Sequence, residues 1–294
     1  MSATSKILKI LVFFCLTILP FTGVFAQVED PEEDPNVTES GKPRDTIPRD
    51  DIYDRYMTAE KLTLAYDHLH EKDVMWEKRI WRLIDTREKR NHHFAYEKKP
   101  FIRILLDAAK KGDIQAFSVI DDEFTTALTQ EEMQQLGSSV DTVITFDPET
   151  FQEIVTVVVN ELNPNDVKQY RLKEVYFFDE ERSDLGVRIL GIAPIVNRYD
   201  DNGNFLNSGP MFWTSYPDMR RILAKTPYFN ESNDVNHMSW EDVFEARIFS
   251  SYIIKESNVY DRRIQDYKTG IDVLYESDKI KDGIFHFEHD LWDY

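Results

Sequence analysis

Runs of β-branched and aromatic residues between positions 140 and 213 constrain the fold of this chain more than any other feature. The runs lie at 143–145, 154–159, 175–178 and 187–196. Such runs favour strands. Asp-Asn-Gly-Asn at 201–204 is typical of a hairpin turn, because Asn and Gly both adopt positive φ readily. We therefore expect about five or six mostly antiparallel strands in this part of the chain.

The residues on either side of this β-rich stretch follow a helical period. Trp76, Ile80, Leu83 and Ile84 recur at the spacing of one helix face, which predicts a helix over 73–90. Apolar spacing, capping residues and terminal glycines predict further helices at 100–112, 129–137, 217–224, 239–253 and 272–281. The expected fold class is α+β, with N-terminal helices, a central, mostly antiparallel sheet and C-terminal helices.

The first 26 residues have the pattern of a secretory signal peptide. Lys6 and Lys9 precede an apolar run at 10–19, and Val-Phe-Ala before Gln27 is a small-x-small cleavage site ending at Ala26. A bilayer-spanning helix needs about 20 apolar residues, so this run is short for a membrane anchor, which is the alternative interpretation. We expect an exported chain that begins at Gln27.

Cleavage after Ala26 would also remove Cys15, which is the only cysteine. The mature chain would then contain no disulfide and would depend on its hydrophobic core for stability. Cys15 lies inside the apolar run rather than at the cleavage point, so a lipid anchor is not expected. Attachment to a membrane would require a partner protein, without direct membrane insertion.

Charge is distributed unevenly along the chain. The 35 Lys and Arg against 54 Asp and Glu give −19, which disfavours nucleic acid and anionic membranes as partners. The signal peptide carries two lysines and no acid, so the mature value is −21. Twelve cations and six acids between Lys72 and Lys111 make that block +6 and leave −27 elsewhere. This segregation predicts salt-sensitive head-to-tail contacts between copies of the chain, which would form a ring or a filament. The alternative explanation for the segregation is ordinary variation in surface charge.

Aromatic residues make up 13% of the chain, and Trp, Tyr and Arg commonly anchor protein interfaces. A large aromatic core is the competing explanation for each aromatic residue. The candidate partner-binding residues are Trp76, Arg79, Trp81, Arg82, Arg87, Arg90, Phe212, Trp213 and Tyr216.

Motifs for catalysis or cofactor binding are missing from the sequence. It contains no phosphate-binding glycine loop, no Gly-x-Ser-x-Gly and no His-Glu-x-x-His. Polar clusters at 92–93, 121–123, 200–202 and 286–290 fit capping, turn or solvated roles better than a site. We predict no catalytic residue, no cofactor and no metal site.

Several segments, taken in order, resemble one family. They are Val74-Met75-Trp76-Glu77, Arg82-Leu83-Ile84-Asp85, Asp121-Asp122-Glu123-Phe124, Met211-Phe212-Trp213 with Tyr216-Pro217, Trp240-Glu241-Asp242-Val243-Phe244-Glu245-Ala246-Arg247, Glu256-Ser257-Asn258-Val259-Tyr260-Asp261-Arg262 and Glu288-His289-Asp290-Leu291-Trp292. From about residue 50 to the C-terminus, the chain resembles the gliding-motility GldN family, called PorN in secretion work, which is a component of the type IX secretion system.

This resemblance implies a non-enzymatic, periplasmic protein that is required for protein secretion and gliding. The family binds an outer-membrane lipoprotein, gliding protein K, and forms a large ring with it. It also contacts the periplasmic part of the motor subunit, gliding protein M. The resemblance thus implies that the chain is attached peripherally to the outer membrane through the lipoprotein. It also implies that the ring contains several copies of the chain.

Two Asp-Thr-aliphatic patterns are similar to the periplasmic O-glycosylation pattern of such bacteria. They make Thr46 and Thr142 candidate glycosylation sites.

The expected organisation is a signal peptide at 1–26, an acidic disordered tail at 27–50 and a single GldN-like domain at 51–294. Within that domain we expect a helical part at 51–137, a β-rich part at 138–214 and a helical part at 215–294.

Two other classes of protein stay open at this point. An exported acidic hydrolase would need a carboxylate pair in a deep cleft. A periplasmic ligand- or peptide-binding protein would need a single large apolar pocket.

Overall fold

The computed structural model describes residues 60–136, 138–146, 153–199, 204–235 and 237–291. These residues belong to one compact unit, Arg55–Tyr294, which is separate from Met1–Asp54. The predicted signal peptide and the predicted acidic tail, which includes Thr46, lie outside the described residues.

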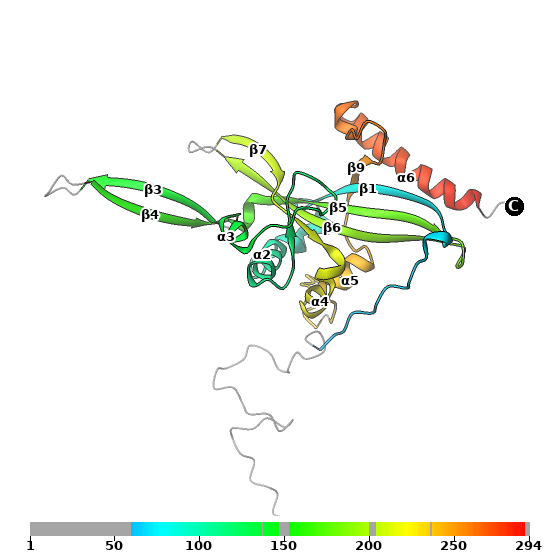
Figure 1. Ribbon diagram of the computed structural model, residues 1–294, viewed down its shortest axis with the longest axis horizontal. Coiled ribbons are helices and arrows are strands. Elements are labelled where there is room, and N and C mark those ends of the chain that lie inside the picture. The colour runs from blue at the N-terminus through cyan, green and yellow to red at the C-terminus, as the bar shows by residue number, and fades with distance from the viewer. Residues whose placement is uncertain (1–59, 137, 147–152, 200–203, 236, 292–294) are drawn as a thin grey trace, which may run out of the picture. The chain divides into compact units, whose positions relative to one another are not determined.

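A seven-stranded antiparallel sheet organises this unit (Figure 1). Its strands pair in the order β2-β8-β6-β5-β1-β9, and β7 pairs with β6 beside that path. The strands are β1 (Val74–Asp85), β2 (Ala116–Phe117), β5 (Val167–Asp179), β6 (Asp184–Tyr199), β7 (Phe205–Pro210), β8 (Trp213–Ser215) and β9 (Tyr252–Glu256). A separate antiparallel pair is formed by β3 (Ser138–Phe146) and β4 (Glu153–Glu161), and Thr142 lies in β3.

Helices precede and follow most of the strands. They are α2 (Phe101–Lys111), α3 (Gln130–Leu136), α4 (Tyr216–Lys225), α5 (Trp240–Glu245) and α6 (Asp272–Asp290). Short 3₁₀ helices are η1 (Glu71–Asp73), η2 (Lys89–Ala95), η3 (Pro164–Asp166) and η4 (Ile264–Asp266). The predicted α+β class, with helices towards both ends and an antiparallel sheet between them, is confirmed.

Local sequence signals explain where several helices begin and end. Pro100 precedes α2, and Gly112 ends it in the left-handed conformation (φ 78°), as its position after two lysines predicted. The Thr129 hydroxyl and the Glu132 side chain cap α3. Ser239 and Asp242 form the predicted capping box of α5. The flanks of the Asn-Gly hairpin are also confirmed, since β6 and β7 pair across it, although residues 200–203 lie outside the described part.

The helix predicted over 73–90 is wrong, because residues 74–85 form strand β1, which lies between β5 and β9 in the sheet. Val74 to Arg79 alternate between half-buried and exposed positions, but every residue from Ile80 to Asp85 is buried. A strand covered on both faces loses its two-residue period. The apolar residues therefore matched a helical spacing by chance, and the expected helical part at 51–137 contains an internal strand of the sheet.

The helix predicted over 239–253 is also too long. Helix α5 ends at Glu245, and Arg247 takes a positive φ of 54° that turns the chain. Tyr252 and Ile253 then belong to strand β9, which pairs with β1. Helix α6 extends the predicted last helix beyond residue 281 to Asp290.

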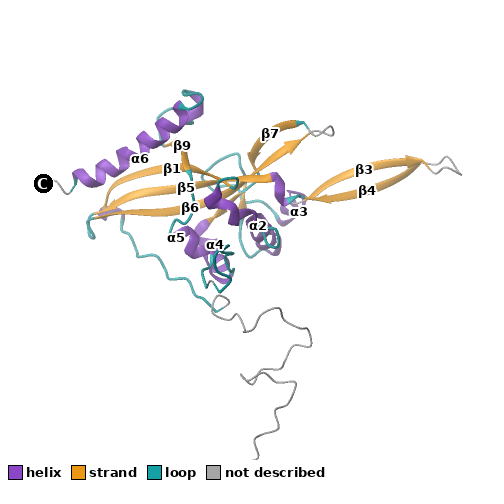
Figure 2. Ribbon diagram, turned by 180° about the vertical axis from the view of Figure 1, so that it is seen from behind, coloured by secondary structure: helices purple, strands orange, loops and turns teal. Residues whose placement is uncertain are grey.

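The helices cover different parts of the sheet (Figures 1 and 2). Helices α2, α4 and α5 pack together on one side, while α6 runs along β9 and β1. The larger core contains Ile84, Tyr170 and Leu172 from the sheet, and Phe101 and Phe244 from the helices. Burial of such large apolar side chains is the main stabilising contribution to a chain that has no disulfide.

Candidate interaction site

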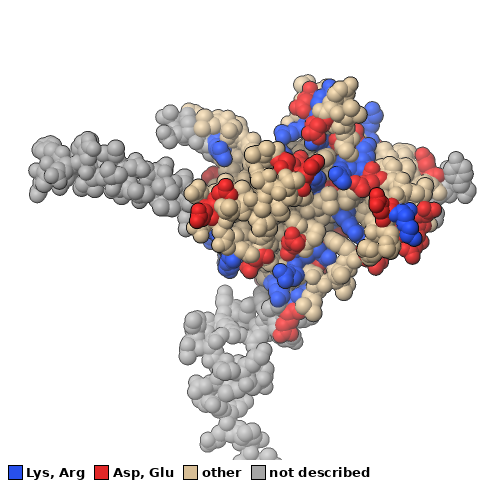
Figure 3. All heavy atoms as spheres, in the orientation of Figure 1, with Lys and Arg blue, Asp and Glu red and all other residues tan. Residues whose placement is uncertain are grey.

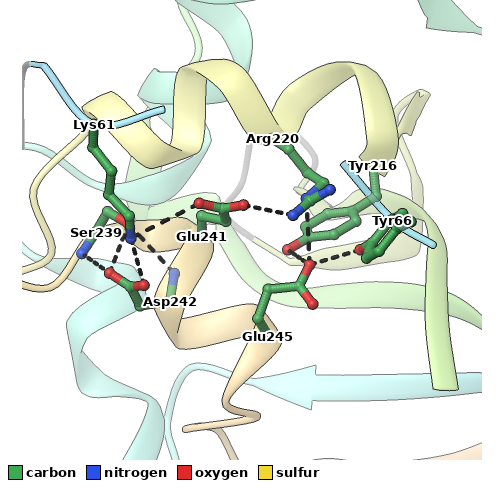
Figure 4. Close-up of polar contacts among 8 residues, drawn as sticks. All are labelled: Lys61, Tyr66, Tyr216, Arg220, Ser239, Glu241, Asp242 and Glu245. Carbon is green, nitrogen blue, oxygen red and sulfur yellow. Dashed lines mark hydrogen bonds and ion pairs between the residues drawn. The ribbon is translucent and has the colours of Figure 1, made fainter. Parts of the chain in front are cut away.

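An extended segment, residues 60–70, lies against α4 and α5, and we call it the arm. No helix or strand forms within it. Its Lys61 ammonium donates a hydrogen bond to Ser239 Oγ at 3.0 Å and contacts the Asp242 carboxylate. Glu241 Oε2 lies 3.8 Å from the same ammonium. Figure 4 shows that one lysine thus reaches three polar residues at the start of α5.

The same residues that begin α5 also bind the arm. Asp242 accepts a hydrogen bond from the Ser239 backbone at 2.8 Å, which completes the capping box. Burial opposes ionisation of Asp242, but the hydrogen bonds from Lys61 and Ser239 hold its pKa below the usual value. The capping box therefore fixes an ionised carboxylate where the arm places its cation.

A second group of contacts holds Tyr66 at the other end of the arm. Its hydroxyl donates to Glu245 Oε1 at 2.6 Å, and the Tyr216 hydroxyl donates to the same oxygen at 3.0 Å. The Arg220 guanidinium lies 4.1 Å from the centre of the Tyr66 ring. Burial, followed by the neighbouring Glu245 carboxylate, raises the pKa of Tyr66 and of Tyr216. Both hydroxyls therefore remain protonated donors at neutral pH.

Arg220 joins the two groups of contacts. Its Nη2 donates to Glu241 Oε1 at 2.8 Å, and its Nε lies 3.5 Å from Glu245 Oε1. Arg220 and Glu241 are 9% and 5% exposed, so this ion pair is mostly removed from solvent. The pair belongs to α4 and α5 alone, so the receiving site is present without the arm.

Of the predicted partner-binding residues, the three from the segment 212–216 lie deepest. Phe212, Trp213 and Tyr216 are 0% exposed. Trp213 packs with Trp81 in a cluster on the sheet, and Tyr216 packs on Phe244. Their positions fit the competing explanation, a large aromatic core.

The predicted residues on β1 and η2 divide between core and surface. Trp81 and Arg82 are buried, and Trp76 is half-buried, with its ring stacked on Phe287 at 4.5 Å. Arg79, Arg87 and Arg90 are exposed; Arg79 pairs with Glu77, and Arg87 with Asp85. Only these three arginines and part of Trp76 are available to a partner in this conformation.

Buried lysines explain why Trp81 is not at the surface. Lys255 lies 4.2 Å and Lys173 5.6 Å from the centre of the Trp81 ring. Lys173 also donates to the backbone carbonyl of Asp122, and Phe124 covers its ammonium at 5.2 Å. Burial lowers the pKa of Lys173, with the Asp122 carboxylate opposing this effect. The polar cluster at 121–123 and Phe124 therefore lie over this face of the sheet.

The predicted basic block contains an exposed cationic surface on η2, α2 and the loop between them. We call it the η2–α2 basic surface: Lys89, Arg90, Lys98, Lys99, Arg103, Lys110 and Lys111. Within the described residues, none of these seven side chains takes part in an ion pair. Elsewhere on the face shown in Figure 3, cations and acids are interspersed.

Carboxylates also gather beside the arm, at the β5–β6 turn. A hollow there is lined by four carboxylates and two arginines: Asp67, Asp179, Glu181, Asp184, Arg182 and Arg188. Asp67 pairs with Arg182 at 3.2 Å, and Asp67, Glu181 and Asp184 are exposed. This open arrangement differs from the enclosed carboxylate pair that a hydrolase would need.

No group of three or more His, Cys, Asp or Glu side chains in the described part of the chain is placed to hold a metal ion. At the C-terminal cluster, His286 contacts the backbone carbonyl of Asp282 within its own helix, at 2.7 Å.

Residues 69–293 match the family described as Gliding motility associated protein GldN. The chain belongs to the GldN family. This match confirms the resemblance drawn from the scattered segments and makes the chain a component of gliding motility and type IX secretion, in a family of structural components rather than enzymes. No curated protein matches the sequence. Among the helices in the described ranges, none is long and apolar enough to cross a membrane.

Comparison with the sequence predictions shows which site residues were missed. Lys61 and Tyr66 carry the arm contacts, and Arg220, Glu241 and Glu245 receive them, yet none was predicted to bind anything. The capping box at Ser239 was the one available signal, and it located α5 without indicating a ligand. Most of the arm also lies before the family match, which begins at Leu69.

Proposed function

We propose that this GldN-family chain is a non-enzymatic, periplasmic structural subunit of the type IX secretion and gliding machinery. In this proposal it forms a ring with an outer-membrane lipoprotein, gliding protein K. It couples this ring to the periplasmic part of the motor subunit, gliding protein M. The lipoprotein attaches the chain peripherally to the outer membrane.

The observation that carries the proposal is the family match over residues 69–293, in a chain whose first residues have an export signal. The absence of cysteine after Ala26 is consistent with a fold that depends on its aromatic core in an oxidising compartment. The η2–α2 basic surface supports assembly, because its seven cations, six of them exposed and none in an ion pair with another described residue, can bind an acidic surface of a partner or of another copy.

Complementation tests the proposed role in cells. Deletion of the gene should abolish gliding and secretion by the type IX route, and the wild-type chain should restore both. A variant lacking residues 1–26 should be expressed but should restore neither, because it stays in the cytoplasm. Restoration by that variant, or normal secretion after deletion, would contradict the proposal.

A further inference from the structure

The arm is attached to the rest of the protein almost entirely through side chains. Within the described residues, no backbone–backbone hydrogen bond joins residues 60–69 to another element. The contacts are those of Lys61 and Tyr66 with α4 and α5, and those of Asp67 with Arg182 and Arg188. The Lys61 contacts are partly buried and the Asp67–Arg182 pair is exposed. Single hydrogen bonds and ion pairs of this kind contribute on the order of 1 kcal/mol each or less, so few contacts oppose the departure of the arm from this site.

Two leucines of the arm do not contribute to its binding in this conformation. Leu62 is 82% exposed and Leu64 is 84% exposed. A segment held by polar contacts, with two leucines directed to solvent, presents apolar surface that a neighbouring molecule can cover. The arm therefore has contacts for two bodies: its polar side chains for the α4–α5 site, and its leucines for a further surface.

The site on α4 and α5 is complete apart from the arm. The Arg220–Glu241 pair and the Tyr216–Glu245 hydrogen bond involve no arm residue, whereas without the arm Asp242 would lose its lysine and Glu245 one of its donors. A second copy of this chain supplies the same lysine and tyrosine at the same spacing. Exchange between copies therefore conserves every contact made within one chain, which is the basis of domain swapping.

The geometry of the arm allows such an exchange. Residues 60–68, nine in number, would span about 30 Å when extended. The arm joins β1 through residues 69–73, where η1 makes one turn with no buried residue. A change of backbone direction there would redirect the arm without disturbing the sheet.

We propose that, in the assembled state, the arm of one copy occupies the α4–α5 site of the next copy. The exchange is head-to-tail, so it propagates around a closed ring. It rests on the proposed function, because it requires assembly of several copies. Each subunit interface then contains Lys61 and Tyr66 from one copy and Asp242 and Glu245 from its neighbour.

Crosslinking between two differently tagged chains tests this exchange. Both are full-length chains with Cys15→Ser, expressed together in native cells; one carries Lys61→Cys and the other Asp242→Cys. After treatment of intact envelopes with a short bismaleimide, we expect a crosslinked species containing both tags. The pair Tyr66→Cys and Glu245→Cys repeats the test without altering the capping box.

A third chain carries both cysteines of a pair and reports crosslinking within one copy. Crosslinks formed within that chain, with none between the two tagged chains, in envelopes where the copies are assembled, would overturn the exchange and leave the proposed function intact. Absence of any crosslink within or between chains, for both pairs, would also overturn it. Copies that sediment only as monomers, without a lipoprotein partner, would contradict the proposed function and the exchange together.

Discussion

The Tyr66 hydroxyl donates a 2.6 Å hydrogen bond to the same Glu245 oxygen that accepts a 3.0 Å bond from Tyr216. One residue comes from the arm, and the other belongs to α4. The Glu245 carboxylate on α5 therefore connects Tyr66 of the arm to Tyr216 of the core, beside the separate contacts of Lys61 and Asp67. Loss of its bond to Tyr66 would weaken the attachment of the arm while the core stays folded.

Tyr66→Phe tests this connection. Loss of a hydrogen bond to a carboxylate at this partly exposed site should weaken arm binding by about 1 kcal/mol. This energy corresponds to a roughly fivefold increase in the population of molecules whose arm is released. Hydrogen exchange and proteolysis within residues 60–70 should rise, while protection of β1 and β5 stays unchanged. Tyr275→Phe is the matched control, because Tyr275 is 64% exposed on α6. Equal exchange in both variants would show that the bond does not hold the arm.

Glu174 gives a prediction about the core. This carboxylate is 0% exposed and accepts from Arg247 Nη2 at 2.8 and 2.9 Å. Arg247→Met would leave it buried without its main cation, which should reduce the free energy of unfolding by about 3–5 kcal/mol. Urea denaturation measures this loss. The double variant Arg247→Met with Glu174→Met should recover much of it; a double variant as unstable as the single one would contradict this explanation.

Two glycines provide a matched test of the loop that covers the sheet. A Cβ at Gly191 would lie 2.5 Å from Phe124 Cζ and 2.9 Å from the Thr214 carbonyl oxygen, whereas none of the described atoms lies within 4 Å of a Cβ at Gly209. Gly191→Ala should therefore displace Phe124 and destabilise the fold by about 1–3 kcal/mol. Gly209→Ala should change the melting temperature little. Similar melting temperatures for the two variants would show that Phe124 is not packed on Gly191 in solution.

His93 should make the stability depend on pH. Burial, followed by repulsion from His92, lowers its pKa from 6.5 to about 4. Between these values the unfolded chain binds the proton more tightly, so this contribution to stability is complete above pH 6.5 and is lost as the pH falls towards 4. The loss between pH 7 and pH 5 should be about 2 kcal/mol by urea denaturation.

His93→Phe separates this effect from the other titrating groups. The variant keeps an aromatic ring beside Trp240 but should lose most of the pH dependence between 7 and 5. Asp85 acts in a lower range, because a hydrogen bond from Arg87 lowers its pKa from 3.8 to about 2. A pH profile identical in wild type and His93→Phe would rule out His93 as the cause.

The η2–α2 basic surface should be needed for assembly and not for folding. Glu substitutions at Lys98, Lys99 and Lys111 should abolish salt-sensitive association in sedimentation experiments while leaving the melting temperature within a few degrees. The control carries Glu at Arg221 and Lys281, which are exposed cations on α4 and α6. Normal association of the triple variant would assign assembly to another surface.

The ends of several helices could be predicted from the sequence, whereas the internal strand β1 could not. Gly112 and the Ser239 capping box act locally, so they could be recognised without the fold. Strand β1 could not, because its burial on both faces depends on β5 and β9, which are more than 80 residues away in sequence. The same holds for the charges: Arg82 and Glu174 meet only when the sheet forms.

The interaction site was predictable only in part. Exposed arginines on β1 and η2 were identified by composition, but Trp81, Phe212 and Trp213 could be assigned to the core only from the structure. The arm was missed because Lys61 and Asp242 are separated by 181 residues, and no sequence period relates them. Glycosylation of Thr46 or Thr142 stays a prediction that an intact-mass measurement of the native protein would decide.

Purification of the tagged chain from native envelopes, with identification of every protein recovered, tests the central claim most directly. The account predicts an outer-membrane lipoprotein, gliding protein K, together with several copies of this chain in one large complex. Recovery of the chain as a monomer without any lipoprotein, under conditions that keep the envelope complexes intact, would contradict it.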